Sequence, residues 1–420
     1  MMAAIWAAKS GQSVTLYDKN EKLGKKLFLT GKGRCNLTNS CDVEELFQNV
    51  VTNSKFLYSS FYGFTNSDTI EFFKEGGLRV KIERGNRVFP ESDHSSDVIK
   101  TLSNYLKSLN VNVCFNSEVV SFEVENADNS DVKTIKGISV KNINNNTVNS
   151  YSYDKYIMAC GGLSYPSTGS DGNMFNLLKN MGISVTPIRP SLIPLCTDDE
   201  MITKMQGLSL KNVTFSLEVS NKVRYSQMGE MIFTHFGISG PIVLSASSHI
   251  KTKDLLDDTA DFGKCCRLKD GVFGYIDLKP ALNKEVLDER ILRDFSQNEN
   301  KDIVNVLGLL VPNKMTEVLC LKAGIDPHKK IHDVTKVERG LLVERLKRFP
   351  IRITSLRPID EAIITSGGIN VKEINPSTME SKKIRNLYFA GEMIDVDALT
   401  GGFNLQIAWS TAYVAGNDNR

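Results

Sequence analysis

Apolar and polar residues change their spacing along the chain in a way that separates strands from helices. A short apolar run at 387–390 is followed by a glycine and an acidic loop, and from residue 405 apolar residues recur every three or four positions. The first pattern predicts a buried strand and the second a helix. A strand, a glycine-containing turn and a helix in this order predict a corner whose backbone N–H groups approach a ligand carrying negative charge.

The same spacing rules assign the other segments in the first part of the chain. Helical periodicity and strand-like alternation each occur several times before residue 187. We predict helices at 1–9, 66–78, 95–109 and 173–181, and strand-like runs at 14–17, within 111–156, and at 157–160 before two glycines.

Three prolines within 187–194 interrupt regular structure and predict a domain boundary. Short β-like runs then continue to 278, residues 281–347 are rich in helix formers, and strand-like character returns from 351. We therefore expect an α/β domain that is interrupted by an inserted module. The expected limits are 1–187 and 355–420 for the α/β domain, 188–280 and 341–354 for a β-rich domain, and 281–340 for a helical insertion.

Composition narrows the functional classes. Of the 420 residues, 41% are hydrophobic and 24% are charged, which is ordinary for a soluble globular protein. The 51 basic and 49 acidic residues give a net charge of +2, so we expect neither a nucleic acid nor an anionic membrane as partner. No stretch approaches the roughly 18 apolar residues that a membrane span needs. The eight cysteines contain no CxxC pair, which favours a reduced, cytoplasmic setting.

The strand at 14–17 ends at Asp18, where an acid in a dinucleotide-binding fold accepts hydrogen bonds from ribose hydroxyls. The glycine-rich phosphate turn belongs about 20 residues before such an acid, which places it at or before Met1. Either the sequence begins after this element, or the protein lacks its first strand and phosphate loop. We favour the first interpretation.

A second glycine-containing segment lies at 24–39, with the sequence GKKLFLTGKGRCNLTN. Glycines, cations and short polar side chains after an apolar run suit a loop that grips a phosphate-bearing ligand. A solvated basic turn has the same composition, so both interpretations stay open on spacing alone.

Five long strings carry a more specific signal than any single glycine motif. They are GKKLFLTGKGRCNLTN (24–39), GGLSYPSTGS (161–170), GEMIFTHFGISGP (229–241), TSGGI (365–369) and LYFAGEMIDVDALTGGFNLQIAWS (387–410). In this order they resemble the BaiN/YhiN-like family of NAD(P)/FAD-dependent oxidoreductases. The resemblance covers nearly the whole chain.

The resemblance implies a Rossmann-type FAD-binding domain that is interrupted by a β-barrel-like domain with a helical subdomain. It implies FAD as cofactor, with NAD(P)H as a transient donor because no second glycine fingerprint for a resident nicotinamide is visible. The sequence departs from the family in two places: the glycine-rich pyrophosphate loop is missing, and the family's Gly-Asp-Gly appears as Gly172-Asn173-Met174.

The matching positions imply a set of cofactor-binding residues. Asp18 matches the ribose-binding acid and Val119 the residue whose backbone meets adenine. The remaining positions lie in the glycine-containing strings: Gly31, Gly33, Arg34, Cys35, Asn36, Gly161, Gly162, Gly391, Glu392, Gly401, Gly402, Asn404, Leu405 and Gln406.

Three further side chains have a chemical and a structural interpretation. His235 is the candidate proton donor, although its flanking residues equally suit a structural turn. Cys35 is either a redox thiol or a small residue packed near the cofactor, and we favour packing because no partner stands at CxxC spacing. His328 and His332 have the spacing of a metal pair but lack a third ligand, so we expect no metal site.

The sequence therefore indicates a cytoplasmic FAD-dependent oxidoreductase that acts on a small organic molecule, by reducing a C=C bond or oxidising an amine. Two alternatives belong to other classes. One is an RNA-modifying flavoprotein, and the other is a cofactor-free remnant that acts only as a binding protein.

Overall fold

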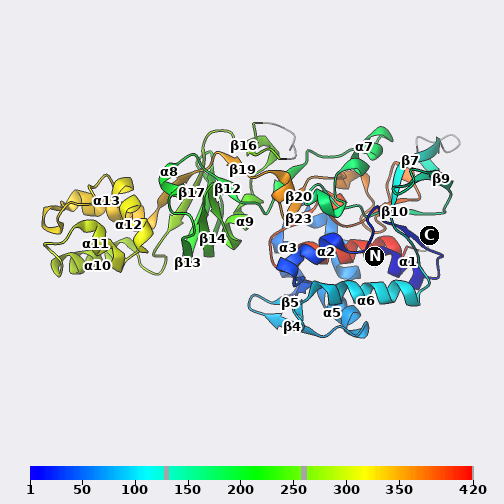
Figure 1. Cartoon of the computed structure of the whole chain (residues 1–420), viewed down its shortest axis with the longest axis horizontal. Helices are drawn as coiled ribbons and strands as arrows, with labels where there is room; N and C mark the ends of the chain where they lie inside the picture. The colour runs from blue at the N-terminus through cyan, green and yellow to red at the C-terminus, as the bar shows by residue number, and fades with distance from the viewer. Residues whose placement is uncertain (127–131, 257–262, 419–420) are drawn as a thin grey trace. The chain divides into compact units, whose positions relative to one another are not determined.

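The computed structural model describes residues 1–126, 132–256 and 263–418, and the chain separates into two compact units (Figure 1). Unit 1 contains Met1–Ser191 and Ile359–Arg420, and unit 2 is the continuous segment Leu192–Pro358. Unit 1 is thus built from two distant parts of the sequence. Strands β11 (Arg189–Ser191) and β20 (Ile364–Ser366), which flank the inserted segment, pair antiparallel within unit 1.

The α/β prediction for unit 1 is confirmed by two pairs of parallel strands. Strand β1 pairs with β6, and strand β10 pairs with β22. Parallel strands need crossover connections, and the intervening helices supply them. In the part of the chain that the structure describes, no strand links one pair to the other. The strands are β1 (Thr15–Tyr17), β6 (Asn112–Cys114), β10 (Tyr156–Met158) and β22 (Leu387–Phe389).

Two apolar helices pack against each other in the core of unit 1. These are α1 (Met2–Lys9) and α14 (Phe403–Gly416), which lie side by side in Figure 1. A Cβ on Gly416 would stand 2.5 Å from the carbonyl oxygen of Ala3, so the helices cross at the distance that only glycine permits. The Trp6 and Tyr413 rings meet edge to face beside this crossing, with centroids 4.7 Å apart.

Smaller elements complete unit 1. Helix α5 begins with a capping box: the Thr65 hydroxyl accepts from the Asp68 N–H, and the Asp68 carboxylate accepts from the Thr65 N–H. Residues 143–147 connect β8 to β9. Elements used below are α2 (Lys25–Leu29), β2 (Thr38–Asn39), α3 (Val43–Asn49), α5 (Asn66–Glu75), β4 (Val80–Glu83), β5 (Arg87–Pro90), α6 (Ser95–Ser108), β7 (Ser117–Asn126), β8 (Lys133–Asn142), β9 (Val148–Tyr151) and α7 (Asn173–Asn180).

Unit 2 contains an eight-stranded sheet in the order β16-β19-β12-β15-β14-β13-β17-β18. Within the described ranges the two end strands do not pair, so the sheet is open and the expected barrel-like closure is not seen. Helices α10 to α13 form one group (Figure 1), in which α13 contacts β17 and β18. The bounds are β12 (Leu195–Cys196), β13 (Ser209–Val219), β14 (Lys222–Thr234), β15 (Gly237–Ser239), α9 (Pro241–Ser247), β16 (Cys266–Arg267), β17 (Val272–Asp277), α10 (Lys284–Ser296), α11 (Ile303–Val306), α12 (Asn313–Ala323), α13 (Lys336–Lys347), β18 (Phe349–Arg352) and β19 (Ser355–Leu356).

No helix among the described residues combines the length and the apolar character that crossing a membrane requires.

Candidate functional site

The early glycine-containing loop and the late glycine turn, some 360 residues apart, are in direct contact in unit 1. Strand β2 lies against the start of α14, and a Cβ on Gly402 would stand 2.4 Å from the Thr38 carbonyl oxygen. The Asn39 side chain donates to the Gly401 carbonyl oxygen at 3.1 Å, and the Trp409 indole N–H donates to the Leu37 carbonyl oxygen at 2.9 Å. Close packing of the two backbones and hydrogen bonds from side chains to backbone thus hold the two segments together.

The Gln406 side chain is completely buried and lies at the centre of this contact. Its oxygen accepts from the Thr38 hydroxyl at 2.6 Å and from the Thr69 hydroxyl at 2.9 Å. Its amide nitrogen donates to the Phe64 carbonyl oxygen at 3.2 Å and to the Ser410 hydroxyl at 2.9 Å. All polar atoms of this side chain are engaged within the protein, and the Gln406 N–H donates to the Gly402 carbonyl oxygen at 3.0 Å, so Gln406 fixes the start of α14 without offering a free group to a ligand.

The N-terminus of α14 offers backbone N–H groups to a ligand. The N–H groups of Phe403, Asn404 and Leu405 have no acceptor among the residues that the structure describes. Such groups at a helix start carry partial positive charge and favour an anion or an electron-rich oxygen. The Asn404 side chain is occupied by the preceding loop, since it bonds the N–H and the carbonyl oxygen of Ala398 at 2.9 and 2.8 Å.

The loop that precedes β2 has an unusual backbone. Gly31, Lys32, Gly33 and Cys35 all have positive φ, with values of 58°, 59°, 85° and 58°. Positive φ is uncommon for residues other than glycine, and such conformations concentrate at ligand-binding loops. The next residue, Asn36, has a buried side-chain oxygen with no hydrogen-bond partner within the described ranges. This oxygen is free to accept a hydrogen bond from a ligand.

The Cys35 thiol is fully buried, and burial raises its pKa to about 12. A thiolate is the reactive form, so the structure favours packing over redox chemistry for this residue. We expect Cys35 to stay unmodified when the native protein is treated with iodoacetamide at pH 8, while exposed Cys265 reacts. Peptide mass spectrometry measures both sites in one sample. Alkylation of Cys35 at a rate near that of Cys265 would show an accessible, ionised thiol instead.

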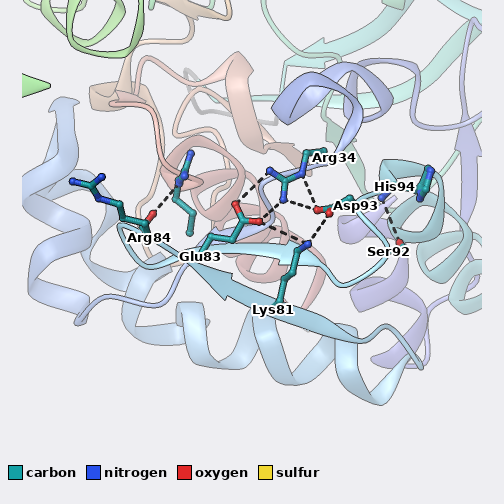
Figure 2. Close-up of polar contacts among 8 residues, drawn as sticks. Arg34, Lys81, Glu83, Arg84, Ser92, Asp93 and His94 are labelled. Carbon is teal, nitrogen blue, oxygen red and sulfur yellow. Dashed lines mark hydrogen bonds and ion pairs between the residues drawn. The ribbon is translucent and has the colours of Figure 1, made fainter. Parts of the chain in front are cut away.

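Arg34 belongs to a cluster of two cations and two carboxylates (Figure 2). The guanidinium Nε donates to Asp93 at 2.8 Å, a terminal nitrogen also bonds Glu83, and the group lies 4.2 Å from the centre of the Phe89 ring. The Lys81 ammonium donates to the second oxygen of Asp93 at 2.6 Å. The cluster ties the loop before β2 to the hairpin of β4 and β5.

The charges of this cluster balance one another. The Arg34 guanidinium holds the pKa of Glu83 below its ordinary value, and the Lys81 and Arg34 cations do the same for the pKa of Asp93. Both carboxyls therefore stay ionised at neutral pH, and their contribution to stability is lost only as the pH falls through these lowered values. Because its guanidinium is paired with Glu83 and Asp93, Arg34 holds its own loop in place and does not present a free positive charge to a ligand.

A second corner of unit 1 joins other predicted site residues. A Cβ on Gly162 would stand 2.2 Å from the Thr365 hydroxyl, and one on Gly161 would stand 2.6 Å from the Ser170 hydroxyl. The Gly391 N–H donates to the Thr411 hydroxyl of α14 at 3.0 Å. Glu392 binds the side chains of Lys26 and Ser164. Close approach between chain segments thus explains Gly161 and Gly162.

Asp18 and Val119 lie together beside the parallel pair of β1 and β6. The Asp18 carboxylate accepts from the N–H and the side chain of Asn20 at 2.9 and 3.0 Å, and the Asp18 carbonyl oxygen accepts from the Ser117 N–H at 3.0 Å. Val119 follows two residues later on β7, opposite Val140. The Asn20 side chain also bonds the Thr168 carbonyl oxygen at 3.0 Å, which links this region to the loop after Gly162.

His235 lies in unit 2, on the two-residue turn between β14 and β15. Its imidazole is exposed and packs edge to face against the neighbouring Phe236 ring. His328 and His332 bond or pair with nearby loop groups, Asp302 and the Glu299 carbonyl oxygen. Among the described residues, no group of three or more His, Cys, Asp and Glu side chains is arranged to hold a metal ion.

Several residues of the site region were not singled out from the sequence. Thr38, Asn39, Lys26, Ser164 and Thr365 all stand inside the strings that carry the family resemblance. Their position inside those strings is the sequence signal that could have identified them as site residues. Their partners lie hundreds of residues away, so no local pattern identified what they touch.

The comparison with known families decides the assignment. The profile of the HI0933-like protein Rossmann domain matches residues 1–418. The chain belongs to the HI0933-like family. The BaiN/YhiN-like resemblance predicted from the motif strings is thereby confirmed.

Relatives of this HI0933-like chain with assigned activities are of two kinds. It is 28% identical over 418 residues to the 3-dehydro-bile acid delta(4,6)-reductase of Clostridium scindens, covering 99% of this chain and 95% of the relative. It is 29% identical over 415 residues to the ribosomal RNA dihydrouridine synthase of Haemophilus influenzae, covering 98% and 94%. The corresponding Escherichia coli enzyme is 26% identical over 418 residues, covering 100% and 94%.

Two solved structures share the fold of this HI0933-like chain. One is the 3-ketosteroid delta1-dehydrogenase of Sterolibacterium denitrificans, with a TM-score of 0.51, 11% identity, and coverage of 99% of this chain and 96% of that chain. The other is the 3-ketosteroid-delta4-(5alpha)-dehydrogenase of Rhodococcus jostii, with a TM-score of 0.50, 11% identity, and coverage of 99% and 94%. At this identity the likeness shows a mixed α/β, Rossmann-type fold and nothing about the substrate.

Proposed function

We propose that this protein is an FAD-dependent reductase that acts on a C=C bond conjugated to a carbonyl group in a small organic molecule, with NAD(P)H as electron donor. The observation that carries the proposal is the contact of β2 with the start of α14, which unites the early loop and the late glycine turn. Membership in the HI0933-like family supports the choice of a flavin.

The residues at this contact fit a flavin. An isoalloxazine edge presents carbonyl oxygens and ring nitrogens, which need donors and acceptors in one plane. The three N–H groups at the start of α14 are the donors, and the unpartnered Asn36 side-chain oxygen is an acceptor. The helix dipole is worth roughly 0.3–2 kcal/mol at such a site and favours the reduced, negatively charged ring.

The chain itself would position the cofactor and exclude water. Bound FAD would supply the hydride that adds to one alkene carbon, while a proton adds to the other carbon and NAD(P)H restores the hydride. Residues Gly391 to Glu392 and Gly161 to Gly162 would hold the remainder of the cofactor, and Asp18 would receive the ribose. The fully engaged Gln406 side chain would keep the start of α14 rigid beneath the ring.

The two kinds of relative share one type of bond change, which favours C=C reduction over amine oxidation. Reduction of a delta(4,6) bile acid and conversion of uridine to dihydrouridine each saturate a C=C bond. In a base or a 3-oxo steroid this bond is conjugated to a carbonyl group. Conjugation lets the carbonyl oxygen accept negative charge as hydride arrives, and this is the charge that an enzyme of this class must stabilise.

RNA modification is the second candidate, because two of the relatives are ribosomal RNA dihydrouridine synthases. Protein contacts to an RNA backbone normally come from a surplus of basic side chains. The chain has only two more basic than acidic residues. We therefore favour the small molecule as substrate.

The test begins with purified protein reconstituted with FAD and reduced anaerobically with NADH or NADPH. We expect the flavin absorbance near its visible maximum to bleach with at least one donor. The reduced protein is then mixed, still without oxygen, with a 3-oxo-4,6-diene steroid or with ribosomal RNA that lacks dihydrouridine. Recovery of the flavin band with the steroid alone supports the proposal.

Recovery with RNA alone would establish the second candidate. A protein produced with the codons upstream of Met1 that still binds no FAD would refute both and favour the cofactor-free binding protein.

A further inference from the structure

Lys26 forms an ion pair with Glu392 that joins distant parts of unit 1. Lys26 lies on α2, and Glu392 follows β22 in the late glycine-containing string. Their side chains are only 24% and 13% exposed. The Lys26 ammonium also donates to the Ser164 hydroxyl at 2.7 Å and to the Ser164 carbonyl oxygen at 3.3 Å. The cation therefore contacts both segments of the second corner, the one that contains Gly161 and Gly162 and the one that contains Gly391 and Glu392.

Every contact that the structure shows for the Glu392 carboxylate is made within the protein. One oxygen accepts from the Thr365 N–H at 2.8 Å and from the Ser164 hydroxyl at 3.0 Å, and the other accepts from Lys26. The Thr365 hydroxyl in turn accepts from the Leu163 N–H at 2.8 Å and the Ser164 N–H at 3.1 Å. The carboxylate thus fixes three segments, and Lys26 supplies the only positive charge that touches it among the described residues.

The position of this carboxylate matters for an anionic ligand. A Cβ on Gly161 would stand 4.0 Å from a Glu392 oxygen, so the carboxylate borders the glycine turn that would receive the cofactor. FAD carries two negative charges on its diphosphate. A largely buried carboxylate without its cation would repel such a ligand, because charges are poorly screened away from water.

We propose that Lys26 is a positioning residue for the cofactor, acting through Glu392: it neutralises the carboxylate and keeps its hydrogen bonds in place, so that an anionic dinucleotide can bind beside it. This inference rests on the proposed function. It assigns to Lys26 no contact with the cofactor and no role in hydride transfer.

The experiment measures FAD affinity by titrating flavin-free protein and following the quenching of flavin fluorescence. Four proteins are compared: the wild type, K26R, K26M and the double variant K26M/E392Q. We expect K26M to bind FAD at least about tenfold more weakly than the wild type, because it leaves an unpaired charge. K26R keeps the cation and should stay within about threefold of the wild type, a difference of under one kcal/mol.

The double variant separates this role from its alternatives. Glutamine at 392 keeps an oxygen for the Thr365 N–H and the Ser164 hydroxyl but carries no charge. We therefore expect K26M/E392Q to bind FAD several-fold more tightly than K26M. If K26M/E392Q binds FAD no more tightly than K26M, the unpaired charge of Glu392 is not what weakens K26M, and the inference is wrong. Circular dichroism of all four flavin-free proteins shows whether each one folds.

A second variant, K26Q, covers the case in which K26M fails to fold, because glutamine keeps hydrogen-bond donors at this position but carries no charge. We expect K26Q to bind FAD at least about tenfold more weakly than the wild type. An affinity of K26Q within about threefold of the wild type would overturn the inference. If the wild type itself binds no FAD, the proposed function fails, whereas equal affinity of wild type and K26M refutes only the role of Lys26.

Discussion

Replacing Gly402 with alanine is expected to destabilise the flavin-free protein by about 3 kcal/mol or more, and to abolish FAD retention. The added Cβ would stand 2.4 Å from the Thr38 carbonyl oxygen and 2.5 Å from its carbon, both backbone atoms. The residue also has φ of 100°, which alanine adopts only with strain. Strand β2 and the start of α14 must move apart to admit the methyl group. Urea unfolding monitored by circular dichroism measures the resulting loss in the free energy of unfolding.

Gly182 provides the matched control for this substitution. It lies in the same unit with a similar φ of 94°, but a Cβ there would meet nothing within 4 Å. G182A should therefore cost only the backbone strain, about 1 kcal/mol. Equal destabilisation by G402A and G182A would show that β2 can move away from α14 at little cost, and would remove the physical basis of the proposed site.

The Gln406→Leu substitution should have the next largest effect, lowering the free energy of unfolding by about 2–4 kcal/mol. Leucine fits a helix as well as glutamine does, so propensity hardly changes. The loss comes from the hydrogen bonds at the centre of the contact. The Thr38 hydroxyl loses its only partner among the described residues, while the Thr69 hydroxyl keeps the Thr65 carbonyl oxygen at 3.1 Å. Urea unfolding again supplies the measurement.

Gln48 on α3 is the control for Gln406. It is exposed, and the same substitution there should change the free energy of unfolding by no more than about 0.5 kcal/mol. If Q406L lowers the free energy of unfolding by less than about 0.5 kcal/mol, the hydrogen bonds of Gln406 contribute little to stability, and water satisfies the threonine hydroxyls instead.

The local elements were readily predicted from the sequence because their causes are local. Periodicity over 95–109 corresponds to α6 at Ser95–Ser108, and the apolar run at 387–390 corresponds to β22 at Leu387–Phe389. The N-cap of α5 was harder to predict from the sequence. It is Thr65, and Asp68 at the third helical position completes the capping box. A sequence shows which residues can cap, while the backbone angles decide which one does.

The site was predicted only in outline, because its contacts connect residues far apart in sequence. Motif matches placed Arg34 and Gln406 near a cofactor, yet they contained no sign that Glu83 and Asp93 would occupy the guanidinium, or that four internal partners would engage the amide. The two carboxylates lie about 50 and 60 residues after Arg34, and three of the four amide partners lie more than 300 residues before Gln406. Spacing rules contain no information on such pairs.

The crossing of α1 and α14 at Gly416 has a consequence for biosynthesis. The ribosome makes α1 long before α14, so the nascent chain exposes the apolar α1 helix throughout most of translation. The inserted segment Leu192–Pro358 is continuous and needs no later residue for its own core. We therefore expect the inserted segment to fold before unit 1, whose core stays incomplete until α14 has been synthesised.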